Sequence, residues 1–210
     1  MSEPVMGWAV CRPRAARRVA MLATALSLLG ALSTPALATG DTSSAQPVFA
    51  IESPKAAKGL MIDVVHAGKR LVAVGDRGHI LYSDDQGNTW TQAKVPTRQL
   101  LTAVYFVDDK HGWAVGHDAQ ILASTDGGAT WAQQYQDLKR EAPLLDVWFK
   151  DAEHGLAVGA YGALIETTDG GKTWDDVSDR LDNEDQFHLN AIAAIKGAGR
   201  VFVGGQGGTV

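Results

Sequence analysis

One eight-residue pattern, [ST]-x-D-x-G-x-T-W, occurs three times in the chain and constrains the fold more than any other feature. An Asp side chain accepts hydrogen bonds from N–H groups just ahead of it, and Gly supplies the positive φ of a tight turn. Trp fills one layer of a β-rich core. Each copy therefore predicts a tight turn between two β-strands, in which the recurring residues are structural: Ser83, Asp85, Gly87, Thr89, Trp90; Ser124, Asp126, Gly128, Thr130, Trp131; Thr167, Asp169, Gly171, Thr173 and Trp174.

The spacing of these copies indicates the architecture. The Trp residues are 41 and 43 residues apart, and in each complete repeat 15 residues separate the Trp from the Gly of a preceding Val-Gly pair. A period of about 40–45 residues with several short strands is typical of β-propeller blades. We therefore predict an all-β chain, a partial propeller of about three and a half four-stranded blades. The Val-Gly pairs are Val74-Gly75, Val115-Gly116, Val158-Gly159 and Val203-Gly204.

Each repeat is expected to supply four short strands, and the second strand is apolar on both faces, as suits a strand buried on both sides. The ranges are 62–65, 71–75, 79–83 and 89–93; 102–107, 113–116, 120–124 and 130–134; 146–149, 156–159, 163–167 and 173–177; and 189–192 and 201–204.

The fourth repeat is incomplete in this sequence. Its Trp would lie about fifteen residues after Gly204, beyond Val210. Propellers close with typically 4–8 blades, and an open one exposes unpaired strand edges. We expect a truncated version of a longer protein; the alternative is a fragment completed by another chain.

The first 38 residues have the features of a secretory signal peptide. A basic segment with four Arg precedes an apolar stretch from Val19 to Leu32, and Ala36-Leu37-Ala38 is a small-x-small cleavage site. The predicted domains are the signal peptide (1–38), a leader (39–58) with one short stretch, 48–51, pairing with the propeller, and the Asp-box repeats (59–210). The protein is expected to be exported, to the periplasm or another extracytoplasmic space.

Cleavage after Ala38 changes the composition in an informative way. It removes the single Cys, four Arg and one Glu, which leaves 15 basic and 23 acidic residues and a net charge of −8. A cysteine-free chain has no disulfide or thiol chemistry. The negative charge argues against nucleic acid and anionic lipid as partners, and we expect no direct membrane insertion after cleavage.

The octet is the Asp-box of sialidases and sortilin-type receptors, and the wider repeat resembles a more specific family. Val104-Tyr105-Phe106, His111-Gly112-Trp113-Ala114-Val115-Gly116 and the following Asp-box, repeated from Val147 to Trp174, are similar to the photosystem II stability/assembly factors. The resemblance covers about residues 60–210. It implies a seven-bladed propeller that acts as a non-catalytic assembly chaperone, with a membrane-complex subunit or its precursor as partner. A thylakoid location is implied only for a phototroph.

Two other functions were weighed against this one. A sialidase-like glycosidase needs three converging Arg and a Tyr–Glu nucleophile pair; no Arg carries the sialidase motif, and Tyr161 and Glu166 fall in a turn and a strand. A sortilin-like peptide receptor is the second alternative. We find no metal site, since His111 and His154 occupy equivalent turns of different blades and Zn²⁺ needs ligands within about 2.1 Å. We therefore expect no enzyme, no cofactor and no metal.

Strand directions in a blade divide its turns between two faces. The Asp-boxes share one face with the turns between first and second strands. The turns between second and third strands share the opposite face with the connections between blades, and loops on a rigid scaffold commonly carry binding. The candidate binding residues on that face are Asp76, Arg77, Arg98, His117, Asp118, Arg140, Tyr161 and Gln206.

Overall fold

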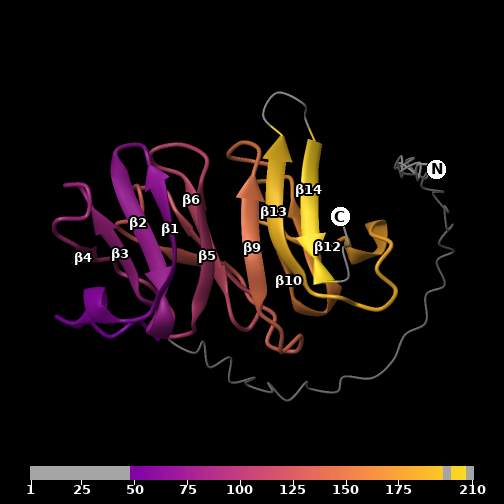
Figure 1. Cartoon of the computed structure of the whole chain (residues 1–210), viewed down its shortest axis with the longest axis horizontal. Helices are drawn as coiled ribbons and strands as arrows, with labels where there is room; N and C mark the ends of the chain where they lie inside the picture. The colour runs from indigo at the N-terminus through magenta and orange to yellow at the C-terminus, as the bar shows by residue number, and fades with distance from the viewer. Residues whose placement is uncertain (1–47, 196–199, 207–210) are drawn as a thin grey trace, which may run out of the picture. The chain divides into compact units, whose positions relative to one another are not determined.

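The computed structural model describes residues 48–195 and 200–206, which form a partial β-propeller (Figure 1). These residues make three four-stranded antiparallel sheets and one two-stranded sheet, each with its strands in sequence order. The predicted signal peptide and the leader up to residue 47 lie outside the described residues. The strands are β1 (Met61–Ala67), β2 (Arg70–Gly75), β3 (Ile80–Ser83) and β4 (Thr91–Gln92) in blade 1; β5 (Leu101–Phe106), β6 (Gly112–Gly116), β7 (Gln120–Ser124) and β8 (Ala132–Tyr135) in blade 2; β9 (Leu144–Phe149), β10 (Gly155–Gly159), β11 (Leu164–Thr167) and β12 (Asp175–Asp176) in blade 3; and β13 (Leu189–Ile195) and β14 (Arg200–Gly205) in blade 4.

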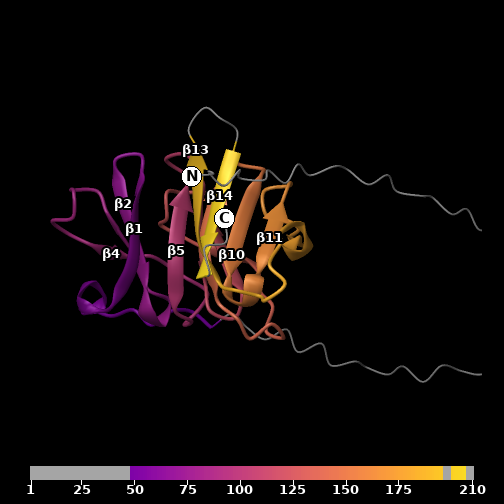
Figure 2. The same cartoon turned by 45° about the vertical axis from the view of Figure 1, so that its right-hand side comes forward.

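The first strands of successive blades lie side by side, in the order β1, β5, β9, β13 (Figure 1). The view in Figure 2 shows the sheets of the blades stacked on one another. Each of these strands has a register shift close to its start. Polar side chains near the shifts bond to the next blade's first strand. These bonds join Asp63 Oδ2 to Val104 N–H (2.9 Å), Thr102 Oγ1 to Leu144 O (2.6 Å) and Asp146 Oδ2 to Ile192 N–H (2.7 Å).

The Val-Gly pairs mark a close backbone approach. A Cβ on Gly75, Gly116 or Gly159 would lie 2.0–2.4 Å from the carbonyl oxygen just before the first strand of its blade. Only Gly fits there. In blade 4 the predicted pair is wrong by one residue: Gly205 pairs with Leu189 as Gly75 pairs with Met61, whereas Gly204 has no atom within 4 Å of its Cβ position. Because Gly204 and Gly205 are consecutive, the sequence did not show which of them pairs with the start of the first strand.

The fourth strands are shorter than predicted. The ranges 89–93, 130–134 and 173–177 were expected, whereas β4, β8 and β12 begin two residues later. The reason is local: the Thr that opens each predicted range gives its backbone N–H to the Asp-box carboxylate, so it belongs to the turn.

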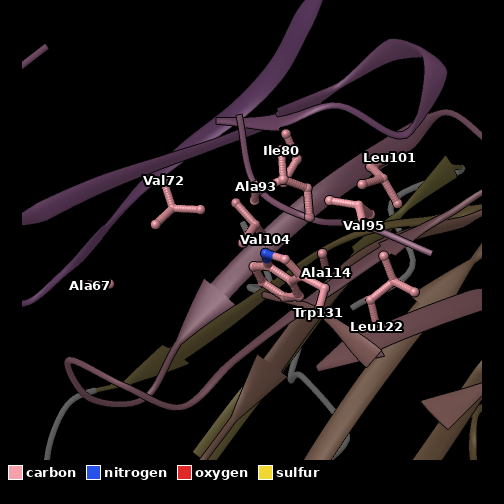
Figure 3. Packing of buried hydrophobic residues seen from close by; sticks show 11 residues of the cluster. Ala67, Val72, Ile80, Ala93, Val95, Leu101, Val104, Ala114, Leu122 and Trp131 are labelled. Carbon is pink, nitrogen blue, oxygen red and sulfur yellow. The ribbon is translucent and has the colours of Figure 1, made fainter. Parts of the chain in front are cut away.

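The hydrophobic core lies between neighbouring blades. Around Trp131, buried apolar residues of blades 1 and 2 form one cluster (Figure 3). In blades 2 and 3 the Phe that ends the first strand packs edge-to-face on the Asp-box Trp of its own blade, as Phe106 does on Trp131 and Phe149 on Trp174. Further clusters join blade 2 to blade 3 and blade 3 to blade 4, so neighbouring blades depend on each other for burial, as in other repeat proteins.

The leader pairs with blade 1 less regularly than predicted. Ala50 N–H donates to Val95 O at 2.9 Å, and the other contacts from residues 48–53 are made with side chains, so no strand forms. A 3₁₀ turn, η1 (Ala56–Lys58), then leads into β1.

Candidate functional site

The three Asp-boxes share one hydrogen-bond pattern. In the second copy, Ser124 Oγ accepts the N–H of Gly128 at 2.9 Å and donates to Asp126 Oδ1 at 2.9 Å. Thr130 donates its N–H to Asp126 Oδ1 (2.9 Å) and its hydroxyl to Oδ2 (2.6 Å). The side chains thus satisfy the polar groups of the turn from within. The first copy uses Ser83, Asp85, Gly87 and Thr89 in the same way, and the third uses Thr167, Asp169, Gly171 and Thr173.

These bonds favour the charged form of each carboxylate. Hydrogen bonds from Thr89 and Ser83 lower the pKa of Asp85 to about 2, and those from Thr173 and Thr167 lower the pKa of Asp169 to about 2. Burial pushes the pKa of Asp126 up, but its hydrogen bonds outweigh this and the pKa is lowered. Both oxygens of each carboxylate accept hydrogen bonds from within the turn.

The third Trp differs from the other two. The indole N–H groups of Trp90 and Trp131 donate to the carbonyls of Gly87 and Gly128. That of Trp174 is buried and has no partner among the described residues. The side chain of Gln134 packs against Gly171 in this box and donates to Gly170 O at 2.9 Å.

Backbone contacts place the Asp-boxes and the turns between first and second strands together. Gly127 N–H donates to Lys110 O at 3.0 Å, and Gly170 N–H donates to Glu153 O at 2.8 Å. We call this side of the propeller the Asp-box face, and the opposite side the loop face.

The two His of the Asp-box face lie in equivalent exposed turns. His111 Nδ1 is 2.8 Å from Asp108 and His154 Nδ1 is 2.9 Å from Asp151. Among the described residues, no group of three or more His, Cys, Asp or Glu could hold a metal ion.

The turns between second and third strands on the loop face contain strained backbone positions. Arg77 (φ 55°), Asp118 (φ 58°) and Tyr161 (φ 56°) have left-handed backbone conformations in the turns between second and third strands. This conformation is uncommon for residues other than Gly, and such strain is often found at functional sites. The side chain of Arg77 is 81% exposed and Tyr161 is 63% exposed. The turns thus direct long side chains into solvent.

The candidate residues of blades 3 and 4 lie close together. Tyr161 N–H donates to His188 Nδ1 at 2.9 Å, and the two rings meet edge-to-face. Gln206 N–H donates to His188 O at 2.9 Å. Arg140, which pairs with Asp176 at 2.6 Å, lines with Tyr161 a hollow of about 530 Å³. His188, which sequence reasoning missed, joins this group because the loop before β13 folds back over η3 (Ala160–Gly162).

The candidates of blades 1 and 2 are separate from that group. Asp118 accepts a hydrogen bond from Gln99 at 2.5 Å, and His117 N–H donates to the carbonyl of Leu100. Asp76 N–H donates to the carbonyl preceding β1, and its carboxylate is 3.7 Å from Arg77. The loop face therefore carries several small groups of residues.

Arg98 and His79 contact the leader. Arg98 Nε donates to Phe49 O at 2.9 Å, and the Nε2 of buried His79 is 3.3 Å from Ile51 O. His79 Nδ1 faces the carboxylate of Asp76 at 3.9 Å. No sequence motif pointed to His79, because its role depends on the leader's path.

The two residues weighed as a sialidase nucleophile pair have other partners. Tyr161 lies against His188, and Glu166 on β11 accepts a hydrogen bond from Arg180 at 2.6 Å.

In the described part of the chain, no helix has the length and apolar character needed to cross a membrane.

Fold and turns together define an Asp-box β-propeller. The family model described as photosynthesis system II assembly factor YCF48 matches residues 83–142 and 133–208, more than half of the chain. The chain therefore belongs to the YCF48 family of photosystem II assembly factors. No curated protein matches the sequence.

Two solved YCF48 structures share the fold. YCF48 from Cyanidioschyzon merolae is 24% identical with a TM-score of 0.56, over 70% of this chain and 48% of that one. A YCF48 bound to a D1 peptide is 24% identical with a TM-score of 0.50, over 55% of this chain and 39% of that one. A GH74 enzyme from Niastella koreensis is 21% identical with a TM-score of 0.47, over 66% of this chain and 21% of that one. The chain thus spans less than half the length of either YCF48.

Proposed function

We propose that this protein is an exported, non-enzymatic binding propeller that aids the assembly or stability of a membrane-protein complex. The observation that carries the proposal is the family match across residues 83–208. A related propeller is known bound to a D1 peptide, which supports a protein segment as the ligand. Under this proposal residues 1–38 direct export, residues 39–58 form a leader, and the propeller acts in the periplasm or an equivalent compartment.

The loop face is the proposed binding surface. Its turns hold Arg77, Asp118 and Tyr161 in left-handed conformations, and the side chains of Arg77 and Tyr161 are exposed to solvent. The Asp-box carboxylates, in contrast, are engaged by their own turns. Ligand recognition on rigid scaffolds is commonly carried by exposed loops, whereas repeated turns hold the scaffold.

Affinity capture from crosslinked envelope, with the full-length protein as bait, tests the proposal. We expect subunits or precursors of a membrane complex to be recovered. Recovery of none, together with turnover of a sialoside, would replace this function with that of a glycosidase. Tight binding of free peptides with no assembly defect on deletion would indicate a peptide receptor.

A further inference from the structure

The leader segment Val48–Ser53, here called the strap, lies against the outer part of blade 1. Its contacts run in the opposite direction to those of blade 1: Phe49 with Arg98, Ala50 with Val95, and Ser53 with Gln92. The strap is thus held antiparallel to residues 92–98, as an extended peptide is held at the edge of a sheet.

Every hydrogen bond between the strap and blade 1 uses the strap's main chain. Arg98 Nε donates to Phe49 O (2.9 Å), Ala50 N–H donates to Val95 O (2.9 Å) and Gln92 Nε2 donates to Ile51 O (3.0 Å). Gln92 Oε1 accepts the N–H of Ser53 at 2.9 Å. Contacts of this kind do not depend on the strap's own sequence.

Two of the strap's side chains are bound loosely. Val48 is 56% exposed and Ile51 is 62% exposed, so neither buries much apolar surface. A hollow of about 310 Å³ remains beside the strap, lined by strap residues and by Gln92, Ala93, Lys94 and Val95. Segments with few buried apolar contacts open at low free energy.

Two strap positions favour a particular type of side chain at the edge of blade 1. Ala50 is partly buried and packs against the core cluster of blades 1 and 2, which favours a small side chain at this position. The ammonium group of Lys94 lies 5.1 Å from the centre of the Phe49 ring, a cation–π contact. The neighbouring position 51 points outward. The edge therefore accepts an aromatic residue followed by a small one.

We propose that this edge of blade 1, formed by His79, Gln92, Val95 and Arg98, is a binding site for an extended segment of a partner protein, which the strap occupies in cis. The preferred segment has an aromatic residue followed by a small residue and is recognised mainly through its backbone. The site is distinct from the Tyr161 group on the loop face. The inference does not depend on the proposed function.

The strap competes with any such segment at the effective concentration set by its tether, in the millimolar range for a short linker. Weakening the strap should expose the site. Ala50→Pro removes the N–H that bonds to Val95, and Ser53→Pro removes the one that bonds to Gln92. Both changes leave the blade side of the site intact.

The test measures binding of a labelled peptide with the sequence of residues 48–55 to the full chain. We expect the Ala50→Pro or Ser53→Pro chain to bind this peptide at least tenfold more tightly than the unaltered chain does. Adding Gln92→Ala and Arg98→Ala to either chain should abolish the gain. In the peptide, Ala50→Trp should abolish binding, Phe49→Ala should weaken it, and Ile51→Lys should leave it unchanged.

Three results would overturn the inference. The first is equal affinity of the altered and unaltered chains for the peptide, with thermal unfolding showing that the altered chains are folded. The second is equal binding of the Ala50→Trp and Ile51→Lys peptides. The third is a strap-exchanged dimer of the unaltered chain, seen by light scattering, which would make a second copy the occupant. Because the probe is the strap's own sequence, none of these results bears on the envelope capture.

Discussion

Trp113 of β6 stacks on Phe149 of β9, with ring centroids 3.4 Å apart and planes 7° from parallel. The contact joins blade 2 to blade 3, and Phe149 also meets Trp174 edge-to-face. Three aromatic rings from two blades thus form one continuous packing unit. The equivalent position in blade 3 is Leu156, which pairs with Trp148 as Trp113 pairs with Tyr105.

Trp113→Ala should destabilise the protein by about 3–5 kcal/mol, because it leaves a cavity between two blades. Trp113→Leu is the matched control, since Leu occurs at this position in blade 3, and its cost should be clearly smaller. Urea unfolding measures both. A loss below about 1 kcal/mol for the Ala variant would show that the blades do not depend on this contact.

The Asp-box hydroxyl gives a second prediction. Ser124→Ala leaves the buried N–H of Gly128 without its acceptor and should cost about 1–3 kcal/mol. Ser124→Thr should be nearly neutral, because Thr167 accepts the equivalent N–H in the third box. Partner affinity of the folded Ala variant should be unchanged. Normal stability with lost binding would make the Asp-box a functional site.

Stability should fall in acid. The pKa values of Asp85, Asp108, Asp151 and Asp169 are each about 2 in the folded protein, and an unfolded Asp titrates near pH 3.9. A depressed folded pKa contributes stability that is fully present above the unfolded value and is lost as pH falls toward 2. Urea midpoints should therefore decrease as the pH is lowered from 5 to 2. Asp85→Asn should make the urea midpoint depend less steeply on pH. A flat profile between pH 4 and pH 2 would contradict the hydrogen-bond account.

Asp146 should couple blade 4 to blade 3. Its Oδ2 accepts the N–H of Ile192 at 2.7 Å, so Asp146→Ala should speed hydrogen exchange at Ile192. Asp63→Ala is the matched control: it removes the equivalent bond to Val104 and should leave Ile192 unchanged. Equal effects of the two variants at Ile192 would show that the coupling is not local.

The repeat pattern predicted the fold because each local requirement is repeated in the sequence. The Asp-box residues make their bonds within eight residues, and the Val-Gly pairs report a backbone approach inside one blade. The pattern failed where a neighbour intervenes. Gln134 belongs to blade 2 but packs against Gly171 in the third box, where the indole N–H of Trp174 has no partner among the described residues.

The candidate site was less predictable than the fold. The strand order assigned Tyr161 and Arg140 to one face, but it gave no sign that His188 would bring Tyr161 and Gln206 together. That contact depends on the path of a long connection, which has no periodicity. The role of Arg98 in holding the strap likewise depends on residues 49 positions away.

Site-specific photocrosslinking in envelope tests the central claim, that the loop face binds a subunit of a membrane complex. One crosslinker replaces Tyr161 on the loop face, and a control crosslinker replaces the exposed His154 on the Asp-box face. We predict adducts with membrane-complex subunits from position 161 and none from position 154. Adducts with such subunits from position 154 alone, or with no membrane-complex subunit from either position, would contradict the account.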